Sequence, residues 1–193
     1  GWHGLDAFGD PWNLILGLAV FFLARLLGNM YFINNIRHEG LILRCRRQLI
    51  SDAVPFLLFF LAFVIRTLLK DGFAVDAETQ TIVMEPYKYF NNLLAMPYLL
   101  ILFLVGVIGV LFGLVKSILS ATYTKGIWFA GTGTVLTVLA LLLCVGYNHT
   151  AYYPSTVDLQ SSLTLANSCS SKFTLTTMAY VSILVPFVLA YIV

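Results

Sequence analysis

The chain has 193 residues, of which 60% are hydrophobic, 15% aromatic and only 10% charged. Soluble globular domains average about 45–50% apolar and about 25% charged residues, so this composition excludes a soluble enzyme, a disordered chain and a disulfide-stapled secreted domain. Eleven basic residues against nine acidic ones give too small a net charge to attract nucleic acid. The composition therefore predicts an integral membrane protein.

Five apolar stretches are long enough to cross a bilayer as helices, which takes about 20 residues each. They cover roughly residues 12–33, 53–69, 93–115, 127–147 and 173–193. The last three contain no Asp, Glu, Lys or Arg, and a helix of that length facing water would carry such residues. The prediction is an all-α fold, a polytopic transmembrane bundle of five spans in a single domain.

The second span is the shortest, and its two ends carry polar residues. Asp52 and Pro55 are interpreted as the N-cap and the first-turn proline of this helix, in preference to a proton-relay carboxylate. Arg66 and Lys70 lie near its other end, where long basic side chains can extend toward the membrane surface.

Prolines and glycines mark the remaining spans. Pro97 and Pro186 are expected to interrupt the third and fifth spans, where neighbouring helices can satisfy the freed backbone groups. Small residues let transmembrane helices approach closely. We expect such contacts at Gly106, Gly109 and Gly113 of the third span and at Gly131 and Gly133 of the fourth.

The charges between the spans predict how the chain lies in the membrane. The connections around residues 34–50 and 116–126 have an excess of Lys and Arg, whereas the 70–92 connection is acidic and the N-terminal segment has no Lys or Arg. Because short cytoplasmic loops are enriched in basic residues, the two basic connections are expected in the cytoplasm. The N-terminal end, residues 70–92 and residues 148–172 are then outside, and the C-terminal end is inside.

Arg25 is the one ionisable residue near the middle of a predicted span. An arginine at the centre of a transmembrane helix costs about 2.5–3.5 kcal/mol on the insertion scale, so its side chain needs a polar surrounding. Gly28 and Asn29 follow at helical spacing and give a small, polar face. Two interpretations stay open: Arg25 anchors an anionic group (a cofactor propionate, a lipid phosphate or a partner carboxylate), or it is a structural residue bonded to backbone carbonyls.

Cysteine and histidine give no metal or catalytic site. Cys45, Cys144 and Cys169 fall in different compartments of the predicted topology, so no disulfide can join them, and they lack metal-ligand spacing. The histidines, His3, His38 and His149, lie outside the spans, although a membrane haem protein needs axial His or Met ligands. Met30, Met96 and Met178 are interpreted as packing residues. We expect no haem, copper or zinc in this chain and no catalytic residue.

The loop before the fifth span is rich in Ser, Thr and Asn. A connection of about 25 residues is long enough to predict that it packs on another part of the protein. Asn148-His149-Thr150 matches a glycosylation sequon, but a tripeptide recurs by chance and this one lies against the predicted membrane.

This loop and the fifth span contain several short motifs whose order resembles that of a known family. They are Pro154-Ser155-Thr156, Ser161-Ser162-Leu163-Thr164, Ser170-Ser171, Thr174-Leu175, Met178 and Leu184-Val185-Pro186. Together they resemble the C-terminal region of subunit II of the bacterial cytochrome bd quinol oxidases. Gly17, Gly28, Tyr31, Glu39 and Phe90-Asn91-Asn92 look like the same subunit in the same order. Since the sequence starts without Met and stops inside its fifth span, we expect the second half of a longer subunit.

The resemblance implies a role in a complex that oxidises quinol and reduces dioxygen to water in the bacterial cytoplasmic membrane. It implies a four-helix bundle plus one peripheral helix, with the haems in a partner, subunit I. Subunit II would support the assembly and stability of subunit I. Its other partners would be small accessory subunits, membrane lipid and, in some members, a structural quinone. The acidic proton-path residues of the family lie in the other half and have no counterpart here. The alternatives are half of a secondary transporter or a membrane scaffold without an enzymatic partner.

Overall fold

The structure is a computed structural model that describes residues 6–76, 79, 81–155 and 157–192. Its long helices are α1 (Pro11–Asn35), α2 (Glu39–Leu69), α4 (Pro97–Leu119), α5 (Gly126–Gly146) and α7 (Lys172–Ile192). All five are long and apolar enough to cross a membrane. The predicted all-α polytopic bundle with five spans is confirmed.

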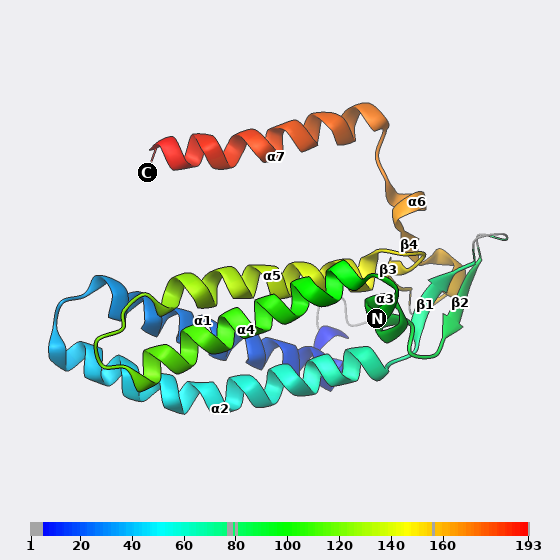
Figure 1. Cartoon of the computed structure of the whole chain (residues 1–193). Helices are drawn as coiled ribbons and strands as arrows, with labels where there is room; N and C mark the ends of the chain where they lie inside the picture. The colour runs from blue at the N-terminus through cyan, green and yellow to red at the C-terminus, as the bar shows by residue number, and fades with distance from the viewer. Residues whose placement is uncertain (1–5, 77–78, 80, 156, 193) are drawn as a thin grey trace.

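Four of these helices form a bundle made of two antiparallel hairpins, α1 with α2 and α4 with α5 (Figure 1). The hairpins meet in one hydrophobic core, to which each helix contributes buried side chains. These include Leu26, Met30, Leu49, Phe56, Leu114 and Ala130. Because large apolar side chains also cover the outside of the bundle, the surface suits a lipid environment or a protein partner.

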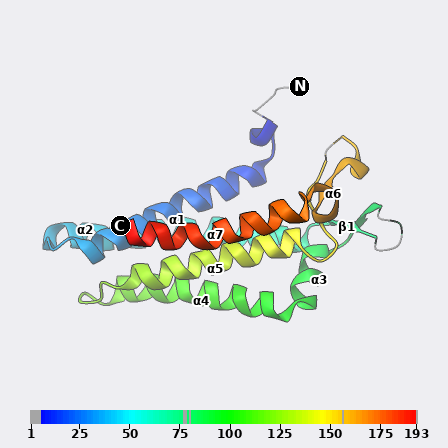
Figure 2. The same ribbon diagram turned by 90° about the horizontal axis from the view of Figure 1, so that it is seen from above.

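The fifth long helix, α7, stands apart from this bundle (Figure 1). Figure 2 shows it lying along the length of the other helices rather than across them. Its side chains from Lys172 to Leu189 are all exposed. Pro186 lies inside this helix, which continues through it to Ile192, so the interruption expected at Pro186 was wrong. The arrangement is that of a four-helix bundle plus one peripheral helix.

The connections gather at opposite ends of the bundle (Figure 1). We call the end with residues 36–38 and 120–125 the basic end, because its exposed cations are Arg37, Arg44, Arg47, Lys116 and Lys125. The other end, the sheet end, carries the short strands. The alternation of basic and acidic connections along the sequence therefore corresponds to two spatially separate ends.

The sheet end is built from two small antiparallel sheets and short helices. The hairpin β1 (Gly72–Val75) and β2 (Ile82–Glu85) is followed by α3 (Lys88–Ala95). The segment before α7 contains β3 (Ala151–Tyr153), η2 (Leu159–Ser161), β4 (Leu163–Thr164) and α6 (Leu165–Ser168). A short 3₁₀ turn, η1 (Asp6–Gly9), precedes α1.

The loop before α7 packs on this hairpin, as its length predicted. Ala74 forms a β-bridge with Thr150, and the Gln160 side chain bonds both backbone groups of Ile82, at 2.9 and 3.0 Å. Two connections that are far apart in the sequence thus form one cap over the end of the bundle.

The start of the second span differs from the prediction. Helix α2 begins at Glu39, with the His38 side chain accepting from the Leu41 amide, so Asp52 and Pro55 lie well inside the helix. The capping interpretation of Asp52 and Pro55 was wrong. The stretch between Glu39 and Asp52 contains three Leu and three Arg, which favour helix. Helix α2 therefore starts well before the apolar stretch.

The start of the third span also differs. Residues 93–95 belong to α3, and Pro97 is the first residue of α4 rather than an interruption of it. The expectation for Pro97 was wrong because a proline at the first helical position loses no intrahelical bond. It also disfavours helical geometry at Met96, which separates α3 from α4.

Glycines bring α4 and α5 into close contact. A Cβ atom added at Gly106 or Gly133 would lie under 3.0 Å from backbone atoms of the facing helix, and Gly113 is equally crowded by Gly126 and Ala130. A Cβ at Gly131 would meet nothing within 4 Å. The predicted close approach holds at Gly106, Gly113 and Gly133. It also holds at Gly109, where a Cβ would lie 3.3 Å from backbone atoms of α5, whereas Gly131 takes no part in it.

Candidate functional site

The polar centre of the bundle is an ion pair between Arg25 of α1 and Asp52 of α2. The Nε atom of Arg25 lies 3.0 Å from Oδ2 of Asp52. The Asp52 side chain is only 3% exposed, whereas that of Arg25 is 43% exposed. Arg25 therefore binds a carboxylate of its own chain. The second interpretation from the sequence, bonding to backbone carbonyls, does not describe it.

Two further donors complete the surroundings of Asp52. Gln48, one turn earlier on α2, donates to Oδ1 at 3.0 Å, and Asn29 of α1 approaches Oδ2 at 3.5 Å. Both carboxylate oxygens thus accept hydrogen bonds, as a buried carboxylate requires. The spacing of Gln48 and Asp52, and of Arg25 and Asn29, is one helical turn. That spacing was visible in the sequence, but its meaning depended on α2 extending through Asp52.

The guanidinium of Arg25 is less completely bonded than the carboxylate it faces. Its CZ atom lies 5.6 Å from the centroid of the Phe21 ring. Within the described part of the chain, Nε is the one Arg25 atom with a hydrogen-bond acceptor. A Cβ at Gly28, one turn along α1, would meet nothing within 4 Å. The two terminal amino groups therefore have no acceptor among the described residues, on a side chain that is 43% exposed.

Arg46 plays the structural role that the sequence offered for Arg25. Its guanidinium donates to four backbone carbonyls at the end of α4 and in the loop after it, those of Ser117, Ser120, Ala121 and Tyr123. The Arg46 side chain is buried, and the last carbonyls of a helix lack intrahelical partners. Arg46 therefore ties the two hairpins together near the basic end. Sequence reasoning missed it because it sits among other arginines.

A cavity of about 100 Å³ lies between the two hairpins. Each helix of the bundle lines it, for example with Ala19, Phe56, Val110 and Thr137. The Thr137 hydroxyl donates to the Gly133 carbonyl of its own helix. Since ligand pockets usually measure about 300–1,000 Å³, this cavity is smaller than a usual ligand pocket.

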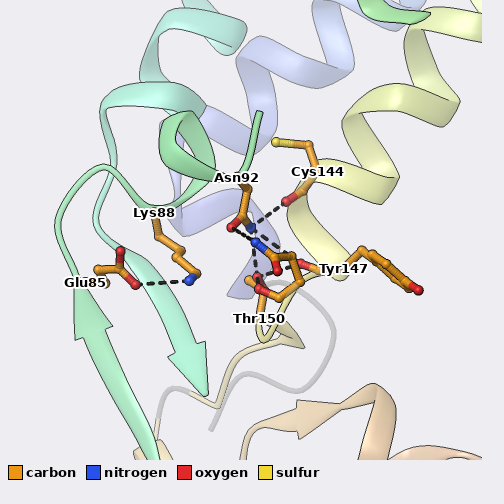
Figure 3. Close-up of polar contacts among 7 residues, drawn as sticks. Glu85, Lys88, Asn92, Cys144, Tyr147 and Thr150 are labelled. Atoms are coloured by element: carbon orange, nitrogen blue, oxygen red, sulfur yellow. Dashed lines mark hydrogen bonds and ion pairs between the residues drawn. The ribbon is translucent and has the colours of Figure 1, made fainter. Parts of the chain in front are cut away.

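A second polar cluster links α3 and α5 at the sheet end (Figure 3). The Asn92 amide donates to the Thr150 hydroxyl at 2.9 Å and to the carbonyls of Cys144 and Tyr147 at 3.1 and 3.4 Å. Lys88 pairs with Glu85 at 3.0 Å beside it. Nearby, burial raises the pKa of the Tyr89 phenol. These contacts fix the cap on the bundle and leave no group positioned for chemistry among the residues drawn.

The sequon asparagine belongs to this same cluster. Asn148 donates its side-chain amide to Asn92 at 3.1 Å, and both Asn148 and His149 have positive φ, 61° and 52°. The amide that glycosylation would modify is thus part of the internal packing, in agreement with reading the tripeptide as a chance match.

The potential metal ligands are dispersed. Cys45, Cys144 and Cys169 are free thiols that are half-buried, buried and exposed, respectively. His38 caps α2 at the basic end, and His149 is exposed at the sheet end; His3 lies outside the described residues. Met30 and Met96 are buried, whereas Met178 of α7 is exposed.

The potential metal ligands of the described residues do not gather at one place. Between residues 6 and 192, with the gaps given above, no three His, Cys, Asp or Glu side chains come together to hold a metal ion. The two described histidines lie at opposite ends, so neither could supply an axial ligand at the bundle centre.

Comparison with known families decides what this bundle is. The sequence model for cytochrome bd terminal oxidase subunit II matches residues 2–193. The chain belongs to this family. A search of curated proteins found no match. Membership in the subunit II family makes the chain part of an oxidoreductase complex and a multi-pass membrane protein, and it confirms the resemblance seen in the sequence.

Proposed function

We propose that this subunit II chain is a non-haem membrane component of a quinol-oxidising, dioxygen-reducing complex, in which it supports assembly and stability of the haem-bearing subunit. The single observation that carries the proposal is the match to the subunit II family over residues 2–193. The family membership favours this role over a transporter half or an unattached scaffold.

The side chains agree with a role outside the chemistry. The described histidines lie at the two ends of the bundle, and its buried polar residues bond one another or the backbone. The haems, in this proposal, belong to subunit I. The cavity between the hairpins is smaller than a usual ligand pocket, so in this proposal any structural quinone would sit outside that cavity.

The proposed setting is the bacterial cytoplasmic membrane, with the basic end inside and the sheet end outside. Exposed Arg37, Arg44, Arg47, Lys116 and Lys125 at the basic end support this orientation, since cytoplasmic loops are enriched in basic residues. The chain would form a single domain that corresponds to the second half of the subunit, and small accessory subunits would bind the assembled complex.

Deleting and restoring the chain in its own membrane tests the proposal. We expect loss of the chain to lower both the amount of haem-bearing subunit and the quinol-driven oxygen uptake of that oxidase, and re-expression to restore both. Unchanged haem content and oxygen uptake without the chain would contradict the proposal.

A further inference from the structure

In the Arg25–Asp52 pair, both oxygens of the carboxylate accept hydrogen bonds, whereas the guanidinium has donors without an acceptor in the part of the chain that the structure describes. Asp52 accepts from Arg25, Asn29 and Gln48, which engages both of its oxygens. A guanidinium has five N–H donors, and in the described residues only the Nε donor of Arg25 has an acceptor. The unused donors belong to a side chain that is 43% exposed.

The depth of Arg25 makes these unused donors costly. Arg25 lies ten residues before Asn35, the end of α1, which is about 15 Å along a helix axis. For a helix that spans the bilayer, that is about half of the hydrocarbon thickness, which would place the Arg25 backbone far from the lipid phosphates at either surface. Polar donors at this depth need an acceptor, and charged residues in transmembrane segments almost always face protein or a water-filled cavity.

We propose that the terminal amino groups of Arg25 bind a carboxylate on a membrane-embedded helix of another subunit of the complex. The proposal rests on the proposed function, since it needs a subunit partner. The planar guanidinium suits it, because its donors form a fork that matches a carboxylate. Arg25 would then bridge two carboxylates, Asp52 through Nε and the partner's through the terminal nitrogens. The open surface beside Gly28 leaves room for the approaching helix.

The test separates two roles of Arg25: binding a carboxylate of another subunit, and neutralising the charge of Asp52. An affinity tag on this chain is used to purify the detergent-solubilised complex, and the haem retained per tagged chain is measured after dilution. The variants are Asp52→Asn, Arg25→Gln with Asp52→Asn, and Arg25→Lys. Arg66→Gln serves as the matched control, because Arg66 is an α2 arginine that packs over the Trp12 ring.

The double variant leaves no charge in the pair, so the chain should accumulate normally. We expect its association with the haem-bearing subunit to weaken about tenfold, while Arg66→Gln stays within about twofold of the unmodified chain. Asp52→Asn keeps the guanidinium of Arg25 and should lose less haem than the double variant. If the double variant fails to accumulate, Arg25→Lys decides: it keeps a charge opposite Asp52 but not the fork, and we expect a comparable loss of haem.

The deciding variant is the double variant or, if that one does not accumulate, Arg25→Lys. If it retains as much haem as the unmodified chain, the inference is overturned. Loss of a bound anionic phospholipid from that variant, with haem retained, would also overturn it and identify a lipid as the acceptor. If the unmodified chain itself retains no haem, the proposed function fails first, so the two failures are distinguishable.

Discussion

Two arginines of this chain show different ways to stabilise a guanidinium inside a membrane protein. Arg46 is buried and donates to four backbone carbonyls, so it needs no carboxylate. Arg25 neutralises a buried carboxylate and is itself 43% exposed. The Arg46 arrangement joins two parts of the fold, whereas the Arg25 arrangement leaves donors without an acceptor among the described residues.

We expect Arg46→Gln to destabilise the bundle by about 1.5–3 kcal/mol, because hydrogen bonds from a charged donor are lost and the carbonyls at the end of α4 lose their partner. The measurement is thermal unfolding of the detergent-solubilised protein. Arg47→Gln is the control, since Arg47 is the exposed neighbour. Equal stability of the two variants would show that the carbonyl contacts of Arg46 contribute nothing.

For single residues, the sequence predicted that Arg25 needs a polar surrounding, but it did not predict which residue pairs with Arg25. The position of Arg25 near the middle of an apolar stretch was enough to predict a polar surrounding. Its partner Asp52 lies on another helix, and the apolar stretch after Asp52 made it resemble a helix cap. Periodicity within one helix says which face a residue occupies, and the identity of the facing residue depends on how two helices pack.

At the scale of whole helices, the close contact between α4 and α5 depends on glycines. Gly133 has the Gly106 carbonyl oxygen and the Val110 amide within 3.0 Å of where a Cβ would lie, and Gly131 on the same helix has nothing within 4 Å. A single helix therefore supplies both a test position and a matched control.

Gly133→Ala should force α4 and α5 apart and destabilise the bundle by about 1–3 kcal/mol, the usual cost of overpacking. Gly131→Ala should leave stability within about 0.5 kcal/mol of the unmodified protein, as substitutions away from packed features do. The resistance of each variant to unfolding in mixed SDS micelles measures the difference. A destabilised Gly131→Ala, or an unaffected Gly133→Ala, would contradict the packing described here.

The cap at the sheet end depends on Asn92. Replacing Asn92 with Ala removes its bonds to Cys144, Tyr147 and Thr150 and leaves buried groups without a partner, which costs about 1–3 kcal/mol. We expect faster hydrogen exchange of the backbone from residue 147 to 151. Asn91→Ala is the control because Asn91 is exposed, and equal exchange in both variants would exclude the role of Asn92.

The long elements were predictable and the short ones were not, for a physical reason. Crossing a bilayer takes about 20 apolar residues, so hydropathy along the chain reveals each span. Strands β1 and β2 have four residues each and α3 has eight, and their formation depends on contacts with β3, Gln160 and Thr150. Those contacts join parts of the chain far apart in sequence, which local patterns do not describe.

At the scale of the whole molecule, the free cysteines offer a test of orientation. Cys169 is exposed beyond the sheet end, Cys45 is half-buried toward the basic end and Cys144 is buried. In single-cysteine chains within spheroplasts, a membrane-impermeant thiol reagent should label Cys169 directly, Cys45 only after permeabilisation, and Cys144 in neither state. Labelling of Cys45 from outside would reverse the proposed orientation.

The separation of α7 from the four-helix bundle (Figure 1) and the apolar outer surfaces describe a subunit adapted to membrane and protein contacts. The polar groups that are buried serve packing, and the described histidines lie at the ends. We propose that this chain supports a haem-bearing partner without binding haem itself.

The most direct measurement of that claim is the reduced-minus-oxidised visible spectrum of two samples purified through a tag on this chain. One sample is the complex from its native membrane, and the other is the chain expressed alone with haem supplied. We predict haem bands in the complex and a flat spectrum for the chain alone. A flat spectrum for the complex, or haem bands from the chain alone, would contradict the claim.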